Sequence, residues 1–321
     1  METEGIWHAV PDRTQTFVGR EKELSQIQDM IGQPLVLCGP TGIGKSEIAI
    51  KHCNDFSEVY DNNVMWINAE TQSSCVLSFI GIAKQLKLIN GDEESEEIVS
   101  KLFDCFRRQG KKAVLVFDNV GLPLDVLQDY LPTNKSPTDI LLQVLITSRV
   151  TQWKLPTIHI DVFPLQDAQR FLQAQRSYSE SIDPDSLTKL ASNLKCSPLA
   201  LQMCASYLNS QKITSDEYTR LFQDKVNHYF TNSLLNYEKT VVTAVRINID
   251  VLKQSSLSLR LLHLCSFFNG ESINTELFFN LDNVKSMDVK MALAEIAELG
   301  LLKKQSGNVM MHARTRKVNR W

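Results

Sequence analysis

The sequence GPTGIGKS at residues Gly39–Ser46 decides the fold, because it matches the phosphate-binding pattern G-x-x-x-x-G-K-[ST] at every specified position. A loop of this kind wraps around a β-phosphate with its backbone N–H groups pointing inward, and glycines allow the dihedral angles that this requires. The helix after the loop adds its positive N-terminal end. We expect Lys45 to reach the β- and γ-phosphates and the Ser46 hydroxyl to ligate Mg²⁺.

The sequence on both sides of the loop supports a parallel sheet. An apolar run at 35–38 precedes the loop and helical sequence at 45–52 follows it, which is the context that the motif requires. Further apolar runs at 64–69, 113–118 and 143–147 alternate with segments of helical spacing. Short runs that are apolar throughout are typical of parallel strands covered on both faces, and their alternation with helices predicts βαβ units. We therefore predict a doubly wound α/β domain of the P-loop NTPase fold, ending near residue 160.

Beyond residue 163 the apolar spacing becomes helical. Helices are predicted within 186–209 and over 241–252, 257–268 and 288–299. Two short apolar segments then flank Ser306-Gly307-Asn308, and helices followed by a hairpin with a Gly-Asn turn suggest a winged helix. The expected organisation has four parts: an irregular lead-in at 1–16, a nucleotide-binding α/β domain at 17–162, an all-α helical domain at 163–239 and a winged-helix domain at 240–321.

Composition narrows the class of protein. The 321 residues are 43% hydrophobic, and a net charge of −3 provides no bulk positive field for nucleic acid or a membrane surface. No apolar stretch approaches the roughly 20 residues of a membrane span, and the acidic start at 1–4 is not expected to be a secretory signal. The seven cysteines are scattered without a C-x-x-C pair, which favours reduced thiols and a cytoplasmic location.

Polar residues follow two of the predicted strands. Asp118 ends the run 113–118, where a carboxylate faces the ligand crevice of a parallel sheet and is the expected acidic partner of magnesium. Asn119 follows, where many hydrolytic P-loop proteins have a second carboxylate, and an amide cannot act as a general base. We therefore expect slow hydrolysis. Thr147-Ser148-Arg149 closes the fourth predicted strand, and the Arg149 guanidinium is expected to sense the γ-phosphate.

Other motifs occur in a fixed order around the loop. They are Phe17-Val18-Gly19-Arg20-Glu21, Trp66-Ile67-Asn68-Ala69-Glu70, Phe117-Asp118-Asn119, Ile146-Thr147-Ser148-Arg149, Ser197-Pro198-Leu199-Ala200-Leu201 and Met311-His312. Together, from about Trp7 to Val318, they resemble the NB-ARC domain of the STAND class of signal-transduction ATPases. The resemblance implies a nucleotide-binding domain, a helical domain and a winged helix that close over ADP at rest. It also implies exchange for ATP and rearrangement into a homo-oligomer during signalling, as in innate immunity or cell death.

The resemblance also assigns roles to residues. Val18 and Arg20 would lie beside the adenine, with Pro198 packing near the base from the helical domain. His312 would reach the ADP phosphates from the winged helix. Magnesium would be held by Ser46 and Asp118, and the residues acting on the phosphates would be Lys45, Asp118 and Arg149. The phosphates would be surrounded by Gly39, Thr41, Gly42, Ile43, Gly44, Lys45 and Ser46.

Some positions depart from the family pattern. Cys-Ser at 196–197 replaces the Gly-Leu of a G-L-P-L motif, so only the Pro-Leu pair carries that match. Ala313 stands where many relatives have Asp after Met-His, which weakens the expected resting lock. Asp118-Asn119 is similar to the variant of the branch that carries tetratricopeptide repeats. Two structural alternatives stay open: Pro198 also suits the first turn of a helix, and His312 a hairpin.

The sequence leaves the wider function open. Sensor and effector modules flank this type of domain, and about sixteen residues precede the Phe-Val-Gly-Arg motif, so such modules would be missing from this chain or supplied by partners. One rival function is a DNA-binding regulator using the winged helix; another is a plain slow ATPase. A solvated basic end is the simpler interpretation of the basic tail, so nucleic acid is not an expected partner. The tail residues are Lys303, Lys304, Arg314, Arg316, Lys317 and Arg320.

Overall fold

The computed structural model describes residues 5–89, 95–121, 127–131, 142–175, 183–230, 236–268, 272–279, 281, 284–305 and 307–320. Contacts between residues divide the chain into two compact units. The N-terminal unit comprises Met1–Gln15, Arg20–Pro40 and Gly44–Asp161, and the C-terminal unit comprises Thr16–Gly19, Thr41–Ile43 and Val162–Trp321. Among the helices described, none combines the length and the apolar character needed to cross a membrane. All seven cysteines are described and are free thiols.

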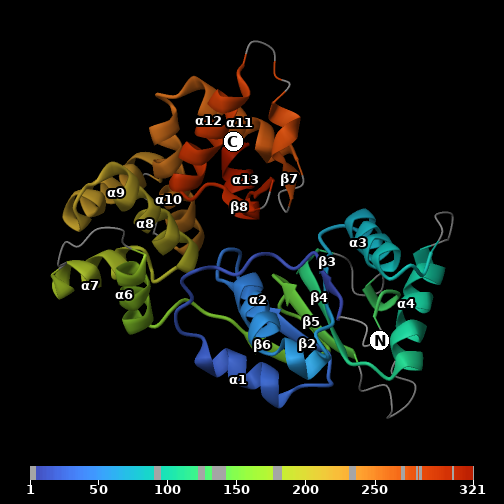
Figure 1. The fold of residues 1–321 in the computed structure, drawn as a ribbon. Coiled ribbons are helices and arrows are strands. Elements are labelled where there is room, and N and C mark those ends of the chain that lie inside the picture. The colour runs from blue at the N-terminus through green and yellow to red at the C-terminus, as the bar shows by residue number, and fades with distance from the viewer. Residues whose placement is uncertain are drawn as a thin grey trace. The chain divides into compact units, whose positions relative to one another are not determined.

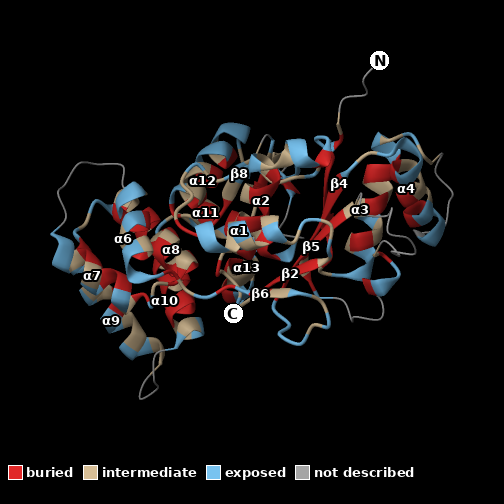
Figure 2. Ribbon diagram, turned by 90° about the horizontal axis from the view of Figure 1, so that it is seen from below, coloured by how far each residue is buried: buried red, intermediate tan, exposed pale blue. Residues whose placement is uncertain are grey.

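A six-stranded sheet forms the centre of the N-terminal unit, and each described strand pair in it is parallel. Its spatial order is β1-β3-β4-β5-β2-β6, so β5 lies between β4 and β2 (Figure 1). The strands β2, β4 and β5 are almost entirely buried, as their apolar sequences predict (Figure 2). The predicted parallel sheet is therefore confirmed. The strand bounds are β1 Trp7–His8, β2 Leu35–Cys38, β3 Val64–Asn68, β4 Ala113–Val120, β5 Leu142–Ser148 and β6 Thr157–His159.

Helices cover both faces of this sheet. On one face, Phe79 of α3 and Leu102 of α4 belong to a hydrophobic core with strand residues such as Val36 and Met65. Successive side chains of a strand point to opposite faces. On the other face α2 packs against β4 and β5, and α1 packs against α2. The helices of this unit are α1 Glu21–Asp29, α2 Lys45–Asp55, α3 Gln72–Gln85 and α4 Ser95–Gln109, with a 3₁₀ helix η1 at Ser57–Tyr60.

The lead-in, expected to be irregular, contributes the edge strand β1. Val64 N donates to Ile6 O at 2.7 Å, and Ile6 N donates to Asn63 Oδ1 at 3.0 Å. The Ile6 side chain is buried, which fixes this segment against the sheet. The sequence pattern predicts neither β1 nor β6, because strands of two or three residues are too short to show a period.

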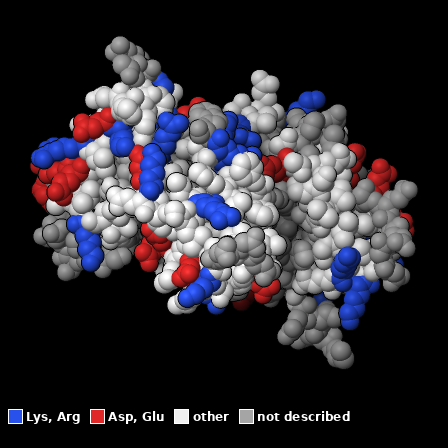
Figure 3. Space-filling model, turned by 90° about the horizontal axis from the view of Figure 1, so that it is seen from above, with Lys and Arg blue, Asp and Glu red and all other residues white. Residues whose placement is uncertain are grey.

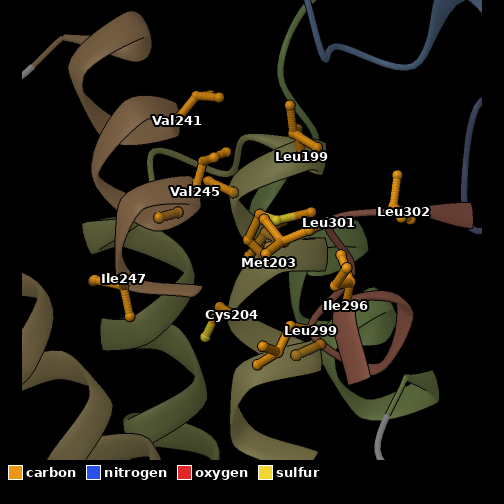
Figure 4. Close-up of a cluster of buried hydrophobic side chains, with 14 of the residues drawn as sticks. Leu199, Met203, Cys204, Val241, Val245, Ile247, Ile296, Leu299, Leu301 and Leu302 are labelled. Atoms are coloured by element: carbon orange, nitrogen blue, oxygen red, sulfur yellow. The ribbon is translucent and has the colours of Figure 1, made fainter. Parts of the chain in front are cut away.

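The C-terminal unit consists mainly of helices around one hydrophobic core. That core extends from Phe163 to Val318, through both the segment expected to be a helical domain and the segment expected to be a winged helix. Figure 4 shows its centre, where residues of α8 such as Met203 lie close to Val245 of α10 and Ile296 of α12. The helices are α6 Leu165–Ala174, α7 Pro184–Asn193, α8 Pro198–Gln211, α9 Ser215–Tyr229, α10 Tyr237–Leu252, α11 Ser256–Phe267, α12 Ser286–Glu298 and α13 Ala313–Asn319, with a 3₁₀ helix η3 at Thr275–Phe278.

A buried asparagine joins three of these helices. Asn248 on α10 is 0% exposed, and its Nδ2 donates to Met203 O on α8 at 2.9 Å and to Leu299 O at the end of α12 at 2.7 Å. Its Oδ1 accepts no hydrogen bond from the described residues. A buried amide donor that loses its acceptor is costly, so these two bonds fix α10 against α8 and α12.

A small antiparallel sheet completes the C-terminal unit, with the order β7-β9-β8. Its hairpin lies where the sequence predicts one, and Gly307 in the turn has a φ of +73°. The first strand, however, consists of Lys303–Gln305. The apolar pair at 301–302, predicted to belong to the hairpin, lies just before this strand and is buried. Ser306 of the predicted turn lies outside the described residues. The strand bounds are β7 Ile273–Asn274, β8 Lys303–Gln305 and β9 Asn308–Met310.

Candidate nucleotide-binding site

The predicted phosphate-binding loop connects β2 to α2 at the C-terminal edge of the parallel sheet. Gly42 and Gly44 both have positive φ, +83° and +100°, and Gly44 occupies the N-cap position of α2. No described atom lies within 4 Å of a Cβ built on Gly44, so glycine is needed there for backbone conformation rather than for space. Because Gly44 has no side chain to cap the helix, the first N–H groups of α2 remain available to an anion.

Lys45 extends back across the loop. Its side chain is 8% exposed, and Nζ donates to Gly39 O at 2.8 Å and to Pro40 O at 3.0 Å. Burial lowers the pKa of Lys45 from 10.5 to about 8, and the nearby Asp118 carboxylate partly opposes that effect. Charged phosphate oxygens are stronger acceptors for an ammonium group than neutral carbonyls. Lys45 is therefore placed to exchange the two loop carbonyls for a phosphate.

Strands β4 and β5 and the start of helix α2 bring Asp118, Thr147 and Ser46 together. Asp118 in β4 is buried, and its Oδ1 accepts hydrogen bonds from Ser46 Oγ at 2.7 Å and from Thr147 Oγ1 at 2.5 Å. Burial raises the pKa of Asp118, whereas the hydrogen bonds from Thr147 and Ser46 oppose that rise. The contact follows from topology, because β5 lies between β4 and β2 and their C-terminal ends share one edge of the sheet.

The backbone of β4 changes direction just beyond Asp118. The register between β4 and β5 shifts between Phe117 and Val120, and Asn119 has a φ of 57°. Asparagine adopts this left-handed conformation more readily than most residues. Asn119 N donates to Thr147 Oγ1 at 2.8 Å. Asn119, which occupies the position of a second carboxylate, thus belongs to a bulge in β4. The Thr147 side chain of the neighbouring strand β5 holds this bulge.

The donor set fits magnesium bound together with phosphate. The Ser46 hydroxyl and the Asp118 carboxylate are hard oxygen donors, which Mg²⁺ prefers. Within the described ranges, no group of three His, Cys, Asp or Glu side chains could hold a metal on its own. Mg²⁺ commonly takes one or two protein ligands and completes its shell with phosphates and water. The two oxygens beside the loop agree with that arrangement.

Two predicted arginines lie in the N-terminal unit. Arg149 follows β5, is exposed, and is close enough to Lys45 for its charge to lower the Lys45 pKa. Arg20 precedes α1 and is buried; its guanidinium donates to Glu23 Oε1 at 2.9 Å and to Asp161 O at 2.7 Å. The predicted roles of Arg149 at the γ-phosphate and of Arg20 beside the adenine stay predictions.

The remaining predicted residues belong to the C-terminal unit. Val18 is partly buried against its core, and Pro198 occupies the first turn of α8. His312 is exposed and caps α13, where its Nδ1 accepts a hydrogen bond from Arg314 N at 3.1 Å. The structural role that the sequence allows for Pro198, in the first turn of a helix, is thus observed, whereas His312 lies beyond the hairpin strands β8 and β9 and caps α13 instead. Their nucleotide contacts stay predictions.

Thr147 is the site residue that the sequence did not single out. It lies at the end of an apolar run, in the Thr-Ser-Arg motif, which drew attention to Arg149 instead. The available signal was a polar side chain one residue before the end of a buried strand: Thr147 is 1% exposed. A buried hydroxyl requires hydrogen-bond partners, and here they are the Asp118 carboxylate and the backbone of Asn119.

The parallel sheet, the glycine loop before α2 and the carboxylate beside Ser46 define a P-loop NTPase. Comparison with known proteins narrows this class. Residues 19–156 match the NB-ARC domain family. Over residues 19–156 the chain therefore carries an NB-ARC domain, within the fold of a P-loop NTPase.

Two relatives illustrate the similarity. A nucleotide-binding leucine-rich repeat (NLR)-like protein of Hyaloscypha variabilis is 23% identical over 240 residues, which are 64% of this chain and 24% of that protein. The crystal structure of a STAND protein with a tetratricopeptide repeat sensor from Pyrococcus horikoshii superposes with a TM-score of 0.64 at 16% identity. That match covers 98% of this chain and 44% of the other. The chain therefore spans less than half the length of either relative.

Proposed function

We propose that the chain is a nucleotide-dependent molecular switch, in which ADP bound at rest is exchanged for ATP and the exchange drives domain rearrangement and homo-oligomerisation. The supporting observation is a phosphate site with Lys45, Ser46 and Asp118 in place, followed by Asn119 instead of a second carboxylate. A side-chain amide cannot take a proton from an attacking water. Bound nucleotide is therefore hydrolysed slowly, and its identity persists long enough to define a state.

The proposed roles follow from the geometry of the N-terminal unit. Lys45 carries the positive charge that compensates the phosphates, and Ser46 and Asp118 hold Mg²⁺ against them. Bound Mg²⁺ supplies further charge neutralisation between the β- and γ-phosphates. Arg149 distinguishes ATP from ADP by pairing with the γ-phosphate, a role for which an exposed guanidinium at the C-terminal end of β5 is suited.

A switch also requires a ligand whose affinity differs between two states of the protein. We propose that α6–α9 act as the helical domain and that α10–α13, with the three-stranded sheet, act as the winged helix. In the resting state Pro198 and His312 contact ADP from these segments. Moving a two-state population from 1:99 to 99:1 requires about 5.5 kcal/mol of differential affinity. A few contacts made only in the closed state can supply that difference.

The proposed setting is signalling in innate immunity or in a cell-death-like response. The names of the two relatives mention leucine-rich and tetratricopeptide repeats, and we propose that comparable sensor and effector modules act with this chain. The free thiols, most of them buried, suit a reducing compartment and support a cytoplasmic location.

The test is to denature freshly purified protein and to identify the released nucleotide by chromatography. Close to one ADP per chain is expected for the wild type, and none for Lys45→Ala, because the substitution removes the cation that faces the phosphates. The melting temperature of the emptied wild-type protein is then measured with added ADP. A wild-type protein that carries no nucleotide and whose melting temperature does not respond to ADP or ATP contradicts the proposal.

The structure gives little support to the alternative of a DNA-binding regulator. Its basic tail includes residues with partners within the chain: Arg314 pairs with Glu238 at 2.9 Å, and Arg316 and Arg320 donate to backbone carbonyls of α11 and the residue after it. On the face shown in Figure 3, Lys and Arg side chains are interspersed with Asp and Glu. A salt-dependent shift of duplex DNA would revive the alternative, since backbone binding weakens steeply with salt.

A further inference from the structure

The hydroxyl group of Thr147 forms hydrogen bonds with two groups of the site, the Asp118 carboxylate and the backbone N–H of Asn119. Its Oγ1 lies 2.5 Å from Asp118 Oδ1 and 2.8 Å from Asn119 N. A backbone N–H can only donate, so the Thr147 oxygen must accept that bond. The hydroxyl proton is then directed to the carboxylate. Because the N–H donates and the carboxylate accepts, the hydroxyl oxygen and the hydroxyl proton each have one partner, and the orientation of the hydroxyl is fixed.

Asp118 is held on one side by this arrangement. Its Oδ1 accepts hydrogen bonds from Thr147 Oγ1 at 2.5 Å and from Ser46 Oγ at 2.7 Å. Two donors from different elements, β5 and α2, restrain the carboxylate plane. Of these two, Ser46 is expected to turn toward Mg²⁺ when magnesium and phosphate bind. Thr147 is then the hydroxyl that remains to orient Asp118.

Asn119 is held by the same oxygen. The register of β4 and β5 shifts between Phe117 and Val120, so the Asn119 N–H leaves the regular ladder of backbone hydrogen bonds. Thr147 Oγ1 is its acceptor. A buried N–H without an acceptor is unfavourable, so loss of this oxygen would loosen the bulge at Asn119 as well as the carboxylate before it.

We propose that Thr147 is a positioning residue of the magnesium–nucleotide site: its hydroxyl couples the Asp118 carboxylate to the backbone of Asn119 and holds both in the orientation that binds the metal. The inference rests on the proposed nucleotide function. It assigns to Thr147 an effect on Mg²⁺-dependent binding and none on the contacts of the loop with phosphate, because Lys45 bonds within the loop and not to Thr147.

The test compares the full chain with Thr147→Val, which keeps the branched shape and removes the hydroxyl, and Thr147→Ser, which keeps the hydroxyl. Each protein is titrated with ATP by calorimetry, once in EDTA and once with excess Mg²⁺, and the ratio of the two affinities is the metal enhancement. We expect the valine variant to lose about tenfold of that enhancement, the loss typical of a hydrogen bond to a charged group. Its affinity in EDTA should stay within about twofold of wild type, and the serine variant should restore the enhancement.

Two further measurements separate positioning from general destabilisation. Thr243→Val removes another fully buried hydroxyl, one that donates to Lys239 O on α10, and should leave the metal enhancement unchanged. Hydrogen exchange at the Asn119 amide should accelerate in Thr147→Val and not in Thr147→Ser. Where Thr147→Val does not fold, Thr147→Ala removes the same hydroxyl without the second methyl group and carries the comparison.

The outcomes distinguish the two proposals. A wild-type enhancement that Thr147→Val retains in full, or Asn119 exchange that the substitution does not change, overturns the role of Thr147 and leaves the switch intact. Equal loss of ATP affinity with and without Mg²⁺ also overturns it, because that pattern indicates damage to the whole loop. A wild-type protein that binds ATP in neither buffer refutes the nucleotide function and, with it, this inference.

Discussion

Raising the pH above 8 is expected to weaken nucleotide binding through Lys45. Its pKa is lowered to about 8 by burial in the ligand-free protein, and bound phosphate, as a neighbouring negative charge, raises it again. Binding therefore takes up a proton above pH 8, and affinity falls tenfold per pH unit there. Between pH 7 and 9.5 the expected loss in ADP affinity is about 30-fold. The phosphate itself changes little in this range, because with a second pKa of about 6 it is already about nine-tenths ionised at pH 7.

The assay is a calorimetric or fluorescence titration with ADP at several pH values in EDTA, which keeps metal hydroxides out of the measurement. Lys45→Arg is the matched control, since a guanidinium stays charged throughout the range and its profile should be flat. Unfolding does not explain a loss, because a lysine with a lowered pKa favours the folded state increasingly from about pH 8 toward 10.5. A flat wild-type profile to pH 9.5, or the same decline in Lys45→Arg, refutes the reasoning.

Three further predictions concern the same unit. Asp118→Asn should abolish the gain in ATP affinity that Mg²⁺ provides while preserving binding in EDTA, measured by calorimetry; retention of the metal effect would place the magnesium ligand elsewhere. Gly44→Ala should destabilise the loop by about 1–2 kcal/mol and weaken ADP binding about tenfold, because its φ of +100° is unfavourable for a residue with a Cβ; unchanged affinity would show that the loop relaxes at no cost. His52 is fully buried against the Tyr60 hydroxyl, and burial lowers its pKa from 6.5 to about 4, so the unfolded chain takes up its proton first as the pH falls. Stability at pH 4.5 should therefore be about 2–3 kcal/mol lower than at pH 7 from this group alone, and urea unfolding of His52→Leu at both pH values should lack that component.

The sequence predicted the parts of the site whose signals are local. The loop motif, the strand at 35–38 and the acid at the end of 113–118 each occupy consecutive residues, and each lies where it was expected. The order of strands, with β5 between β4 and β2, then brings Asp118 beside Ser46 at the C-terminal edge that these strands share.

Contacts that depend on strand register could not be predicted from the sequence. Thr147 and Asp118 are 29 residues apart, and they meet because the parallel register pairs Phe117 with Ile146, one residue earlier in each strand. The bulge of β4 beyond Asp118 then brings the Asn119 N–H to the same hydroxyl oxygen. No residue pattern predicts that bulge, since asparagine is also common in ordinary turns. The short strands β1 and β6 were missed for a different reason: they are fixed by neighbouring strands rather than by their own periodicity.

The helices of the C-terminal unit were largely predicted from apolar spacing, but their partners were not. A stripe of apolar residues shows that one face is buried without showing what covers it. The expected boundary between 239 and 240 falls inside α10, which begins at Tyr237. Residues on both sides of that boundary contribute to one core.

The amide of Asn248 has a practical consequence for recombinant fragments. Ending the chain at residue 239 removes both Asn248 and the stretch from Val241 to Val245 that lies against α8, so the Met203 carbonyl loses its donor and an apolar face meets water. Such a fragment is expected to aggregate, whereas one beginning at Val162 and extending through α13 keeps every buried residue of that core and loses only the partly buried Val18 beside it. For the same reason, any signalling motion within 162–321 must either carry these helices together or break the bonds of a single side chain that spans all three.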